Sequence, residues 1–244
     1  MKEYGIIGKS LSHSFSPRYF DKKFTQESID AVFRAFELAE IDAVNDLLQS
    51  RPQLAGLCVT IPYKEAIIPY LDELDAAALD IGAVNCIQFC GDKRKGYNTD
   101  VIGFSASLKP LLPPEPLSAL VLGTGGASKA VCAALKQLAI PYTIVSRNAI
   151  SGHITYTDLD EQAISAHRLI VNTTPLGTYP DVLELPPIPY NALSAQHILY
   201  DLIYNPAETA FLKEGKSRGA RIKNGLEMLE LQAEENWRLW TAGH

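Results

Sequence analysis

Short apolar runs rich in β-branched residues alternate with helix-like stretches along the whole chain, and this alternation narrows the possible folds more than any other feature. Strands separated by helices pair in parallel, because each helix brings the chain back to the edge of the sheet at which the preceding strand started. The runs that predict strands are residues 4–7, 31–36, 54–60, 83–89, 117–122, 142–145, 169–172, 198–202 and 220–223. We therefore expect an α/β fold built on parallel sheets.

A cluster of prolines at 110–116 interrupts the series, and a second series of strands and helices starts at Leu117. With 244 residues, the chain is long enough for two domains. In the first series, Ser16 followed by Pro17 predicts the N-cap and the first position of a helix. At the other end, apolar residues from Leu226 onward predict a long terminal helix.

Charge and composition exclude several classes of function. Lys and Arg total 22 against 28 Asp and Glu, a net charge of −6, and the chain lacks the long basic runs that nucleic acid requires. The four cysteines form no CxxC pair, which predicts neither a disulfide framework nor a metal site. No apolar run approaches the roughly 18 residues of a membrane span. The sequence also shows no positively charged N-terminal region leading into an apolar stretch, which is the pattern of a secretory signal. We expect a cytoplasmic protein with no nucleic-acid or membrane partner.

A glycine-rich turn follows the first strand of the second series. It comprises Gly123, Thr124, Gly125 and Gly126, and Ala127 follows it. Glycines allow the backbone to turn tightly and to approach a pyrophosphate, whose charge is met by the first amides of the following helix, predicted over 127–138. The pattern predicts a dinucleotide site, although Ser128 stands at the third glycine position of the usual motif. The alternative is a glycine turn that binds no ligand.

Ser146, Arg147 and Asn148 follow the next predicted strand. An NAD site usually carries an acidic residue there, about twenty residues beyond the glycines, to bind the ribose hydroxyls. A guanidinium instead offers a planar pair of donors to a phosphate and no acceptor to a hydroxyl. Arg147 therefore favours NADP over NAD as the nucleotide. The alternative is an ordinary solvated loop charge.

Polar residues also close predicted strands in the first series. Thr60 and Lys64 lie at and just after the end of the strand at 54–60, and Asn98-Thr99-Asp100 closes the series. Ligand-binding groups in open α/β sheets gather at the carboxyl ends of strands, so these side chains are candidates for one site. Each also has a structural explanation, because Thr60 or Asp100 would cap a helix and Lys64 would be a solvated helix charge.

The motifs of the first series resemble those of the shikimate dehydrogenase family. They are His13-Ser14-Phe15-Ser16-Pro17, Val59-Thr60-Ile61-Pro62-Tyr63-Lys64, Gly82-Ala83-Val84-Asn85, and Asn98-Thr99-Asp100 with Gly103. The resemblance implies substrate contacts at Ser14, Ser16, Thr60, Lys64, Asn85 and Asp100. Among these, the two serines would hold a substrate carboxylate, and Lys64 and Asp100 would form the catalytic pair.

The motifs of the second series extend the resemblance to Gln232. They are Gly123–Ala127, Ser146-Arg147-Asn148, Asn172-Thr173-Thr174-Pro175-Leu176-Gly177, Asp201-Leu202-Ile203-Tyr204-Asn205-Pro206 with Thr209, and Gly225-Leu226-Glu227-Met228-Leu229. The resemblance implies substrate contacts at Tyr204 and Gln232, with Gly225 at the nicotinamide. It implies nucleotide contacts at Gly123, Thr124, Gly125, Gly126, Ala127, Ser146, Arg147, Asn148, Thr173, Thr174, Leu202 and Gly225.

The resemblance also implies an architecture and a reaction. A substrate-binding domain would comprise residues 1–101 and 225–244, including a C-terminal helix that returns to it, and a doubly wound, Rossmann-like NADP-binding domain would comprise 102–224. The active site would lie in the cleft between them. The implied reaction is the reversible NADPH-dependent reduction of 3-dehydroshikimate to shikimate in aromatic amino-acid biosynthesis, by a monomer or a homodimer. Two alternatives stay open: a quinate/shikimate dehydrogenase of broader specificity, and a catalytically silent NADP-binding regulatory protein on the same fold.

Three residues depart from the family's pattern. Cys58 replaces the usual Asn before Val-Thr, and Glu227 replaces a Gly near the nicotinamide. Ser151 stands where many members carry a second basic residue for the 2′-phosphate. These departures leave the class of reaction unchanged, but we expect only moderate discrimination between NADP and NAD.

Overall fold

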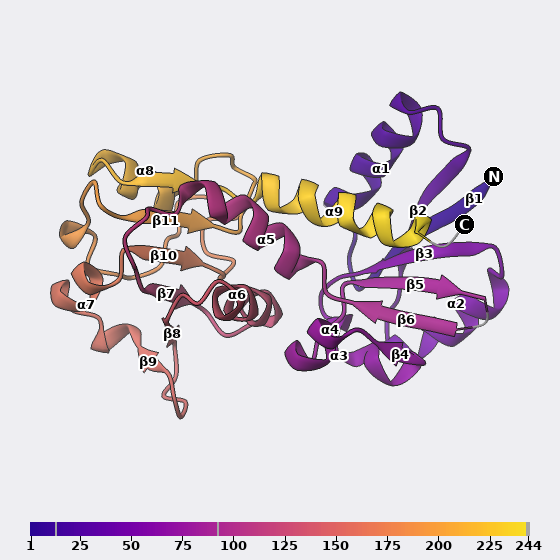
Figure 1. Cartoon of the computed structure of the whole chain (residues 1–244), viewed down its shortest axis with the longest axis horizontal. Coiled ribbons are helices and arrows are strands. Elements are labelled where there is room, and N and C mark those ends of the chain that lie inside the picture. Colours follow the sequence, from indigo (N-terminus) through magenta and orange to yellow (C-terminus); the bar gives the residue numbers. More distant parts are fainter. Residues whose placement is uncertain (13, 92, 243–244) are drawn as a thin grey trace. The chain divides into compact units, whose positions relative to one another are not determined.

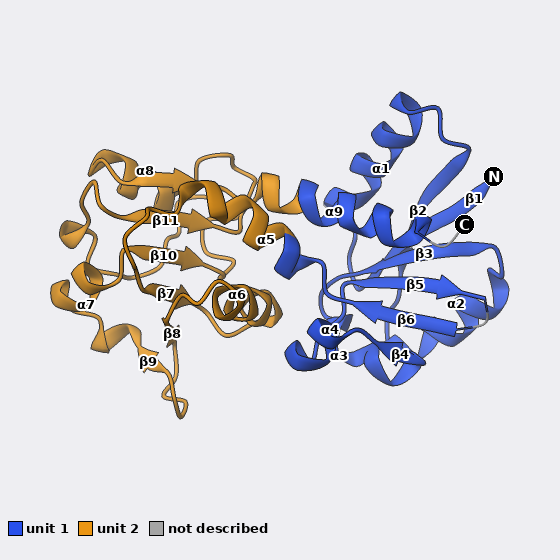
Figure 2. Cartoon of the chain, viewed as in Figure 1, with its two compact units in different colours: residues 1–102, 230–244 blue, residues 103–229 orange. Residues whose placement is uncertain are grey.

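The computed structural model describes residues 1–12, 14–91 and 93–242. The chain divides into two compact units, and Figure 2 shows unit 1 (Met1–Ile102 with Glu230–His244) in blue and unit 2 (Gly103–Leu229) in orange. Both boundaries fall inside helices, namely α5 (Asp100–Leu108) and α9 (Leu226–Thr241) (Figure 1). Among the helices in the described ranges, none combines the length and apolarity needed to cross a membrane.

Within the described residues, unit 1 holds a six-stranded sheet with the strand order β2-β1-β3-β5-β6-β4. The strands are β1 (Lys2–Gly8), β2 (Ala31–Glu37), β3 (Leu54–Val59), β4 (Glu73–Leu74), β5 (Cys86–Cys90) and β6 (Lys93–Tyr97). β1 pairs in parallel with β2 and β3, whereas β5 pairs antiparallel with both β3 and β6. The expectation of parallel pairing is therefore wrong for two strand pairs, β3 with β5 and β5 with β6.

The hairpin of β5 and β6 was not predicted because β6 is charged. Its sequence is Lys-Arg-Lys-Gly-Tyr, and Lys93 forms an exposed ion pair with Glu73 at 2.8 Å. Such a segment carries none of the apolar alternation from which strands are predicted. Gly91 lies in the connection with a φ of +60°, a backbone region that glycine adopts freely. A short turn joins antiparallel neighbours without a crossover helix.

The other helices of unit 1 are α1 (Phe15–Gln26), α2 (Val44–Ser50), α3 (Tyr63–Ala66) and α4 (Ala76–Ile81). α1 begins earlier than predicted, because its N-cap is Ser14 rather than Ser16. Pro17 is accommodated in the first turn, where backbone N–H groups have no intrahelical partner. The side chain of Ser14 makes no capping hydrogen bond, so its hydroxyl is not used to start the helix.

Trp240 fixes the C-terminal part of α9 on the sheet of unit 1. Its buried ring stacks on Tyr4 with centroids 5.0 Å apart, and its Nε1 donates to the carbonyl oxygen of Ile87 at 3.0 Å. Gly56 on β3 leaves room for the ring, because a Cβ at that position would overlap it. Phe20 on α1 also contacts Trp240, so α1 and α9 share one hydrophobic cluster on the same face of the sheet.

Over the part of the chain that the structure describes, unit 2 has six strands in the order β12-β11-β10-β7-β8-β9, all paired in parallel. They are β7 (Ala119–Leu122), β8 (Tyr142–Ser146), β9 (Ile154–Thr155), β10 (Leu169–Asn172), β11 (Ile198–Asp201) and β12 (Arg221–Lys223). Its helices include α6 (Gly126–Gln137), α7 (Glu161–Ala166) and α8 (Ala210–Ser217). The predicted parallel α/β architecture is confirmed in this unit.

The connection between β8 and β9 is unusually short. Parallel neighbours normally need a crossover of a dozen or more residues, whereas here residues 147–153 suffice. Ser146 pairs with Thr155, so the next residues along the two strands, Arg147 and Tyr156, lie at adjacent strand ends. The short connection therefore places these two side chains beside the carboxyl edge of the sheet.

Candidate functional site

Lys64 and Asp100 form an ion pair in unit 1. Lys64 lies on α3, just beyond the carboxyl end of β3, and Asp100 is the first residue of α5. The Lys64 Nζ and Asp100 Oδ2 atoms are 2.6 Å apart, and the two side chains are only 18% and 10% exposed. The structure thus brings together two residues that the sequence placed 36 positions apart. Partial exclusion of water strengthens the attraction between such charges.

Asn85 joins this ion pair to further buried polar groups. Its Nδ2 donates to Asp100 Oδ1 at 2.9 Å, to the Thr99 hydroxyl at 3.0 Å and to Gln232 Oε1 at 3.5 Å. Its Oδ1 accepts from the backbone N–H of Thr99 at 2.7 Å. Lys64, Asp100, Asn85 and Gln232, which come from four separate segments, therefore lie in one connected row of polar side chains.

Ser14 and Thr60 line a cavity in the same unit, with a volume of about 570 Å³. The lining consists of Lys9, Ser10, Ser12, Ser14, Thr60, Ile61 and Pro62. Thr60 follows β3 directly, and its backbone N–H donates to Ile7 on β1 at 3.0 Å. Ser16 is buried on α1 and hydrogen bonds to the Cys58 thiol. His13, which opens the predicted serine motif, lies outside the described residues.

A second cavity, of about 480 Å³, lies in unit 2 at the carboxyl ends of β7, β8 and β10. Its lining consists of Gly123, Thr124, Gly125, Ser146, Arg147, Tyr156, Thr173, Thr174, Pro175, Leu176 and Pro187. Seven of these residues belong to the predicted nucleotide set. This edge of a parallel sheet is where ligands of doubly wound folds bind.

The backbone around the glycine turn suits a dinucleotide. Gly123 has a φ of +111°, and a Cβ there would lie 2.8 Å from the Thr173 hydroxyl. Gly125 and Gly126 have open space where a side chain would otherwise project, so a phosphate can approach their backbone. α6 starts at Gly126, and its first amides carry the positive end of the helix dipole.

Arg147 and Tyr156 both line this cavity, and the two side chains interact electrostatically. Burial raises the pKa of the Tyr156 phenol, and the charge of the Arg147 guanidinium partly offsets that rise. Tyr156 was not among the predicted residues, because it is identified only by the pairing of β8 with the two-residue strand β9. No periodic sequence pattern reveals a strand of that length.

The remaining predicted residues of unit 2 lie near the same edge. Asn148 does not line the cavity, but its carbonyl oxygen accepts the hydroxyl of Ser146. Ala127 follows Gly126 within the first turn of α6. Leu202 and Gly225 are in close backbone contact, because a Cβ on Gly225 would overlap the carbonyl oxygen of Leu202.

Asp201 anchors the segment that follows β11 and carries Leu202 and Tyr204. Its carboxylate accepts hydrogen bonds from Ile203 N at 3.0 Å, Asn172 Nδ2 at 3.1 Å and the Thr209 hydroxyl at 2.6 Å. The side chain is completely buried, and burial raises its pKa to about 6, although the three donors oppose the rise. Asp201 therefore has a structural task in holding this segment.

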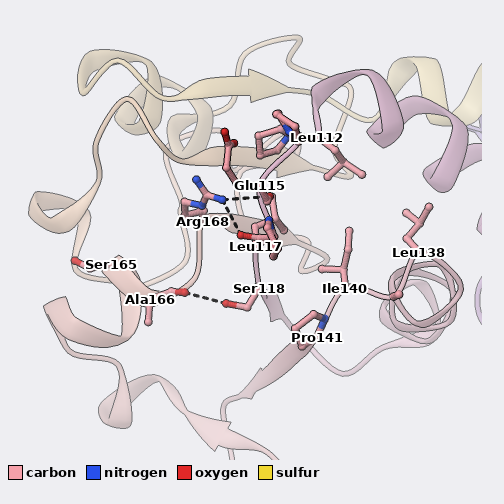
Figure 3. A pocket seen from close by; sticks show the side chains of 14 residues that line it. Leu112, Glu115, Leu117, Ser118, Leu138, Ile140, Pro141, Ser165, Ala166 and Arg168 are labelled. Atoms are coloured by element: carbon pink, nitrogen blue, oxygen red, sulfur yellow. Dashed lines mark hydrogen bonds between the residues drawn. The ribbon is translucent and has the colours of Figure 1, made fainter.

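A further cavity in unit 2, of about 700 Å³, lies at the opposite edge of its sheet. Ser118 and Arg168 line it and directly precede β7 and β10, whereas Gly123 and Thr173 directly follow those strands. Arg168 donates to the carbonyl oxygens of Glu115 and Pro116 at 3.3 and 2.8 Å (Figure 3). This guanidinium is engaged by backbone carbonyls and lies away from the glycine turn.

Comparison with known proteins identifies the family. Residues 6–87 match the model described as the shikimate dehydrogenase substrate binding domain. The chain is 35% identical to a shikimate dehydrogenase (NADP(+)) of Methanococcus aeolicus, with 98% of this chain and 92% of that protein covered. This chain belongs to the shikimate dehydrogenase family. Another member, from Shouchella clausii, is 36% identical with 98% of this chain and 93% of that protein covered.

Solved structures of the shikimate dehydrogenase family have the same fold. The dehydrogenase of Thermus thermophilus in complex with NADP(H) and shikimate superposes with a TM-score of 0.88 at 29% identity, covering 99% of this chain and 94% of that chain. A chorismate mutase/shikimate 5-dehydrogenase fusion protein of Clostridium acetobutylicum gives a TM-score of 0.89 at 33% identity, covering 99% and 91%. The α/β fold and the family resemblance expected from the sequence are therefore confirmed.

Proposed function

We propose that this protein catalyses the reversible NADPH-dependent reduction of 3-dehydroshikimate to shikimate, a step of aromatic amino-acid biosynthesis. The observation that carries the proposal is the Lys64–Asp100 ion pair, joined through Asn85 to Gln232, in a chain of this family. A polar row of this kind suits a carboxylated polyol, which offers hydroxyl and carbonyl oxygens to amide and ammonium donors. Relatives with about 35% identity are named as NADP(+)-dependent shikimate dehydrogenases.

We assign the substrate to unit 1 and the nucleotide to unit 2. In unit 1, the hydroxyls of Ser14 and Ser16 would hold the substrate carboxylate. The Ser14 hydroxyl supports this proposal because it makes no capping hydrogen bond to α1. The side chains proposed to contact the rest of the substrate are Thr60, Lys64, Asn85, Asp100 and Gln232, together with Tyr204 from unit 2. These assignments extend the family's pattern to this chain residue by residue.

In unit 2, the glycine turn and the start of α6 would hold the pyrophosphate through backbone amides. Arg147, which lines the same cavity as the glycine turn, would bind the 2′-phosphate. Gly225, whose position permits no side chain, would lie beside the nicotinamide together with Leu202. The open backbone at Gly125 and Gly126 is the feature of this structure that best fits the nucleotide.

The reduction needs a hydride at the substrate carbonyl carbon and a proton at its oxygen. NADPH, when bound, supplies the hydride. Lys64 would donate a hydrogen bond and then its proton to the carbonyl oxygen as negative charge develops there. Asp100 would hold the ammonium through its Oδ2 while its Oδ1 keeps Asn85 in place. In the reverse direction, neutral Lys64 would accept the proton of the substrate hydroxyl.

We also propose that the reaction takes place in the cytoplasm. The cysteines at 58, 86, 90 and 132 are all free thiols, and three of them are buried. Unpaired cysteines are usual where thiols are kept reduced. The free thiols support the proposal because an oxidising compartment would favour the formation of disulfide bonds between cysteines.

The proposal is tested by mixing purified protein with shikimate and NADP⁺ and following the appearance of NADPH by absorbance. We expect clear turnover, with less turnover of quinate or with NAD⁺. Equal kcat/KM for quinate and shikimate would identify the enzyme of broader specificity. Binding of NADP⁺ without turnover of either acid would identify the silent regulatory protein and refute the proposed function.

A further inference from the structure

A continuous row of buried hydrogen bonds in unit 1 extends beyond the residues already discussed. It includes Asn236, a residue of α9 with no exposed surface. Asn236 is bonded to Thr99, Thr99 to Asn85, and Asn85 to Asp100. The row therefore connects the C-terminal helix with the ion pair of Lys64, and Asn236 is the member of the row that belongs to that helix and is fully buried.

The carboxamide of Asn236 is engaged at both ends. Its Oδ1 accepts from the Thr99 hydroxyl at 2.7 Å, and its Nδ2 donates to Gln232 Oε1 and to Cys58 Sγ, both at 3.3 Å. Gln232 lies one turn earlier on α9, so the two amide side chains share one face of the helix. An amide has two N–H donors and one carbonyl oxygen, so the three contacts engage both donors and the oxygen.

We infer that Asn236 is a positioning residue for this reaction: it sets the orientation of Gln232 and Asn85 without touching the substrate. The inference rests on the proposed function, because it requires those two amides to contact the substrate. Thr99 transmits the effect, since its backbone N–H donates to Asn85 Oδ1 at 2.7 Å and its hydroxyl accepts from Asn85 Nδ2 at 3.0 Å. The hydroxyl that Asn236 orients therefore also fixes the Asn85 amide.

Cys58 supplies the third anchor of Asn236. The thiol is 4% exposed, and burial raises its pKa to about 12, so it stays protonated at neutral pH. Its sulfur accepts the Asn236 amide and also hydrogen bonds to Ser16. The Cys58 thiol on β3 and the Asn236 amide on α9 are therefore hydrogen-bonded neighbours. Cys58 stands where the family pattern has Asn, so in this chain α9 supplies an amide next to that position.

Loss of the Asn236 amide would remove the shorter hydrogen bond from two buried polar groups. The Thr99 hydroxyl would keep Asn85 Oδ1, at 3.2 Å, as its acceptor, and Gln232 Oε1 would keep the Asn85 donor at 3.5 Å. Such groups reorient to find new partners, because an unsatisfied buried polar atom is costly. Displacement of substrate contacts by about 1 Å lowers catalytic efficiency by about 100-fold. The effect should therefore appear in the kinetics with shikimate.

The test compares Asn236→Ala with the control Leu239→Ala, which removes a buried apolar side chain from the same helix. We expect Asn236→Ala to lower kcat/KM for shikimate by about 10- to 100-fold while the KM for NADP⁺ stays unchanged. Leu239→Ala should lower the unfolding temperature and leave both kinetic values unchanged. Thr99→Val, which removes only the linking hydroxyl, should show the same selective loss if Asn236→Ala does not fold.

A rescue experiment separates positioning from general loss of stability. Adding Cys58→Asn to Asn236→Ala returns an amide to the same buried place from β3, and we expect it to recover most of the lost kcat/KM. The inference is overturned if Asn236→Ala loses no more than Leu239→Ala, or if the double variant is no more active than Asn236→Ala. A failure of the proposed function would be seen in a different experiment. In that case the unmodified protein itself would not oxidise shikimate.

Discussion

At the scale of the residue, the chemistry proposed for unit 1 depends on a charge held where water is partly excluded. The ammonium of Lys64 lies 2.6 Å from Asp100 Oδ2, and both side chains are mostly covered. Exposed lysines on the same unit, such as Lys93, form ion pairs that are open to solvent and contribute little. The difference in surroundings, rather than the residue type, distinguishes Lys64 from these lysines and supports its proposed role as the proton donor.

Lys64→Ala should reduce kcat far more than it raises the KM for shikimate, because the proton is delivered only as the transition state forms. A loss of about 10²–10⁴-fold in kcat is the usual contribution of a positioned acid or base. Steady-state kinetics measure both values, and Lys93→Ala provides the control for removing a lysine from unit 1. Near-normal kcat in folded Lys64→Ala protein would contradict the mechanism.

Arg147→Ala should weaken the binding of NADP⁺ by about 1.5–3 kcal/mol and leave the binding of NAD⁺ almost unchanged, because only NADP⁺ carries the 2′-phosphate. The side chain is exposed, so added salt should reduce the difference. Calorimetric titration with each nucleotide measures the effect. Arg168→Ala is the matched control, since Arg168 lies at the opposite edge of the sheet in unit 2. Equal losses for both nucleotides would show that Arg147 does not bind the phosphate.

Single residues differ in how well the sequence predicts their place in a site. Lys64 and the glycines of the turn follow apolar strands, so their position at a sheet edge can be predicted from the pattern. Asn236 cannot be found in this way, because it lies within a helix and contacts Thr99 across 137 positions. Tyr156 is hidden for another reason, since it depends on the pairing of the two-residue strand β9. Long-range packing, which no local pattern encodes, decides both.

At the scale of the element, strands buried on both faces were the most predictable. β7 and β10 are fully buried, β7 is apolar throughout, and β10 is apolar up to its last residue, Asn172. β6 was missed because its side chains are charged, and α1 starts at Phe15 because Ser14, not Ser16, is its N-cap. The terminal helix was predicted from its apolar residues, but its attachment to the sheet depends on Trp240 and on the space at Gly56.

Trp240→Ala should lower the free energy of unfolding by about 3–5 kcal/mol, because it removes a large buried ring and leaves a cavity. The ring is 1% exposed and also donates a hydrogen bond to Ile87. Urea unfolding followed by circular dichroism measures the change. Leu226→Ala, which alters an exposed apolar residue at the start of the same helix, is the control and should change stability by less than about 0.5 kcal/mol. A similar small effect for Trp240→Ala would show that the ring does not anchor α9.

At the scale of the whole molecule, the free energy of unfolding contains opposing contributions from buried charges. Glu3 is buried in unit 1 but forms ion pairs with Arg34 at 2.6 Å and Arg51 at 3.0 Å. Asp201 is buried in unit 2, and the three donors that hold it are a hydroxyl, an amide and a backbone N–H. Uncharged donors compensate a buried carboxylate less completely than guanidinium groups do. Asp201 should therefore make the stability of the molecule depend on pH.

The sign of this dependence follows from the pKa of Asp201, which is about 6 in the folded protein against 3.8 for an ordinary Asp. The folded state binds the proton more tightly, so the contribution of Asp201 to the unfolding free energy increases as pH falls through 6. Between pH 7.5 and pH 5, the increase should be about 1.4 kcal/mol. Urea unfolding of the unmodified protein and of Asp201→Asn at both pH values isolates this contribution, because the other titrating groups are common to both. If the stability of the unmodified protein relative to Asp201→Asn is the same at both pH values, the three hydrogen bonds offset burial and the carboxylate stays charged at pH 5.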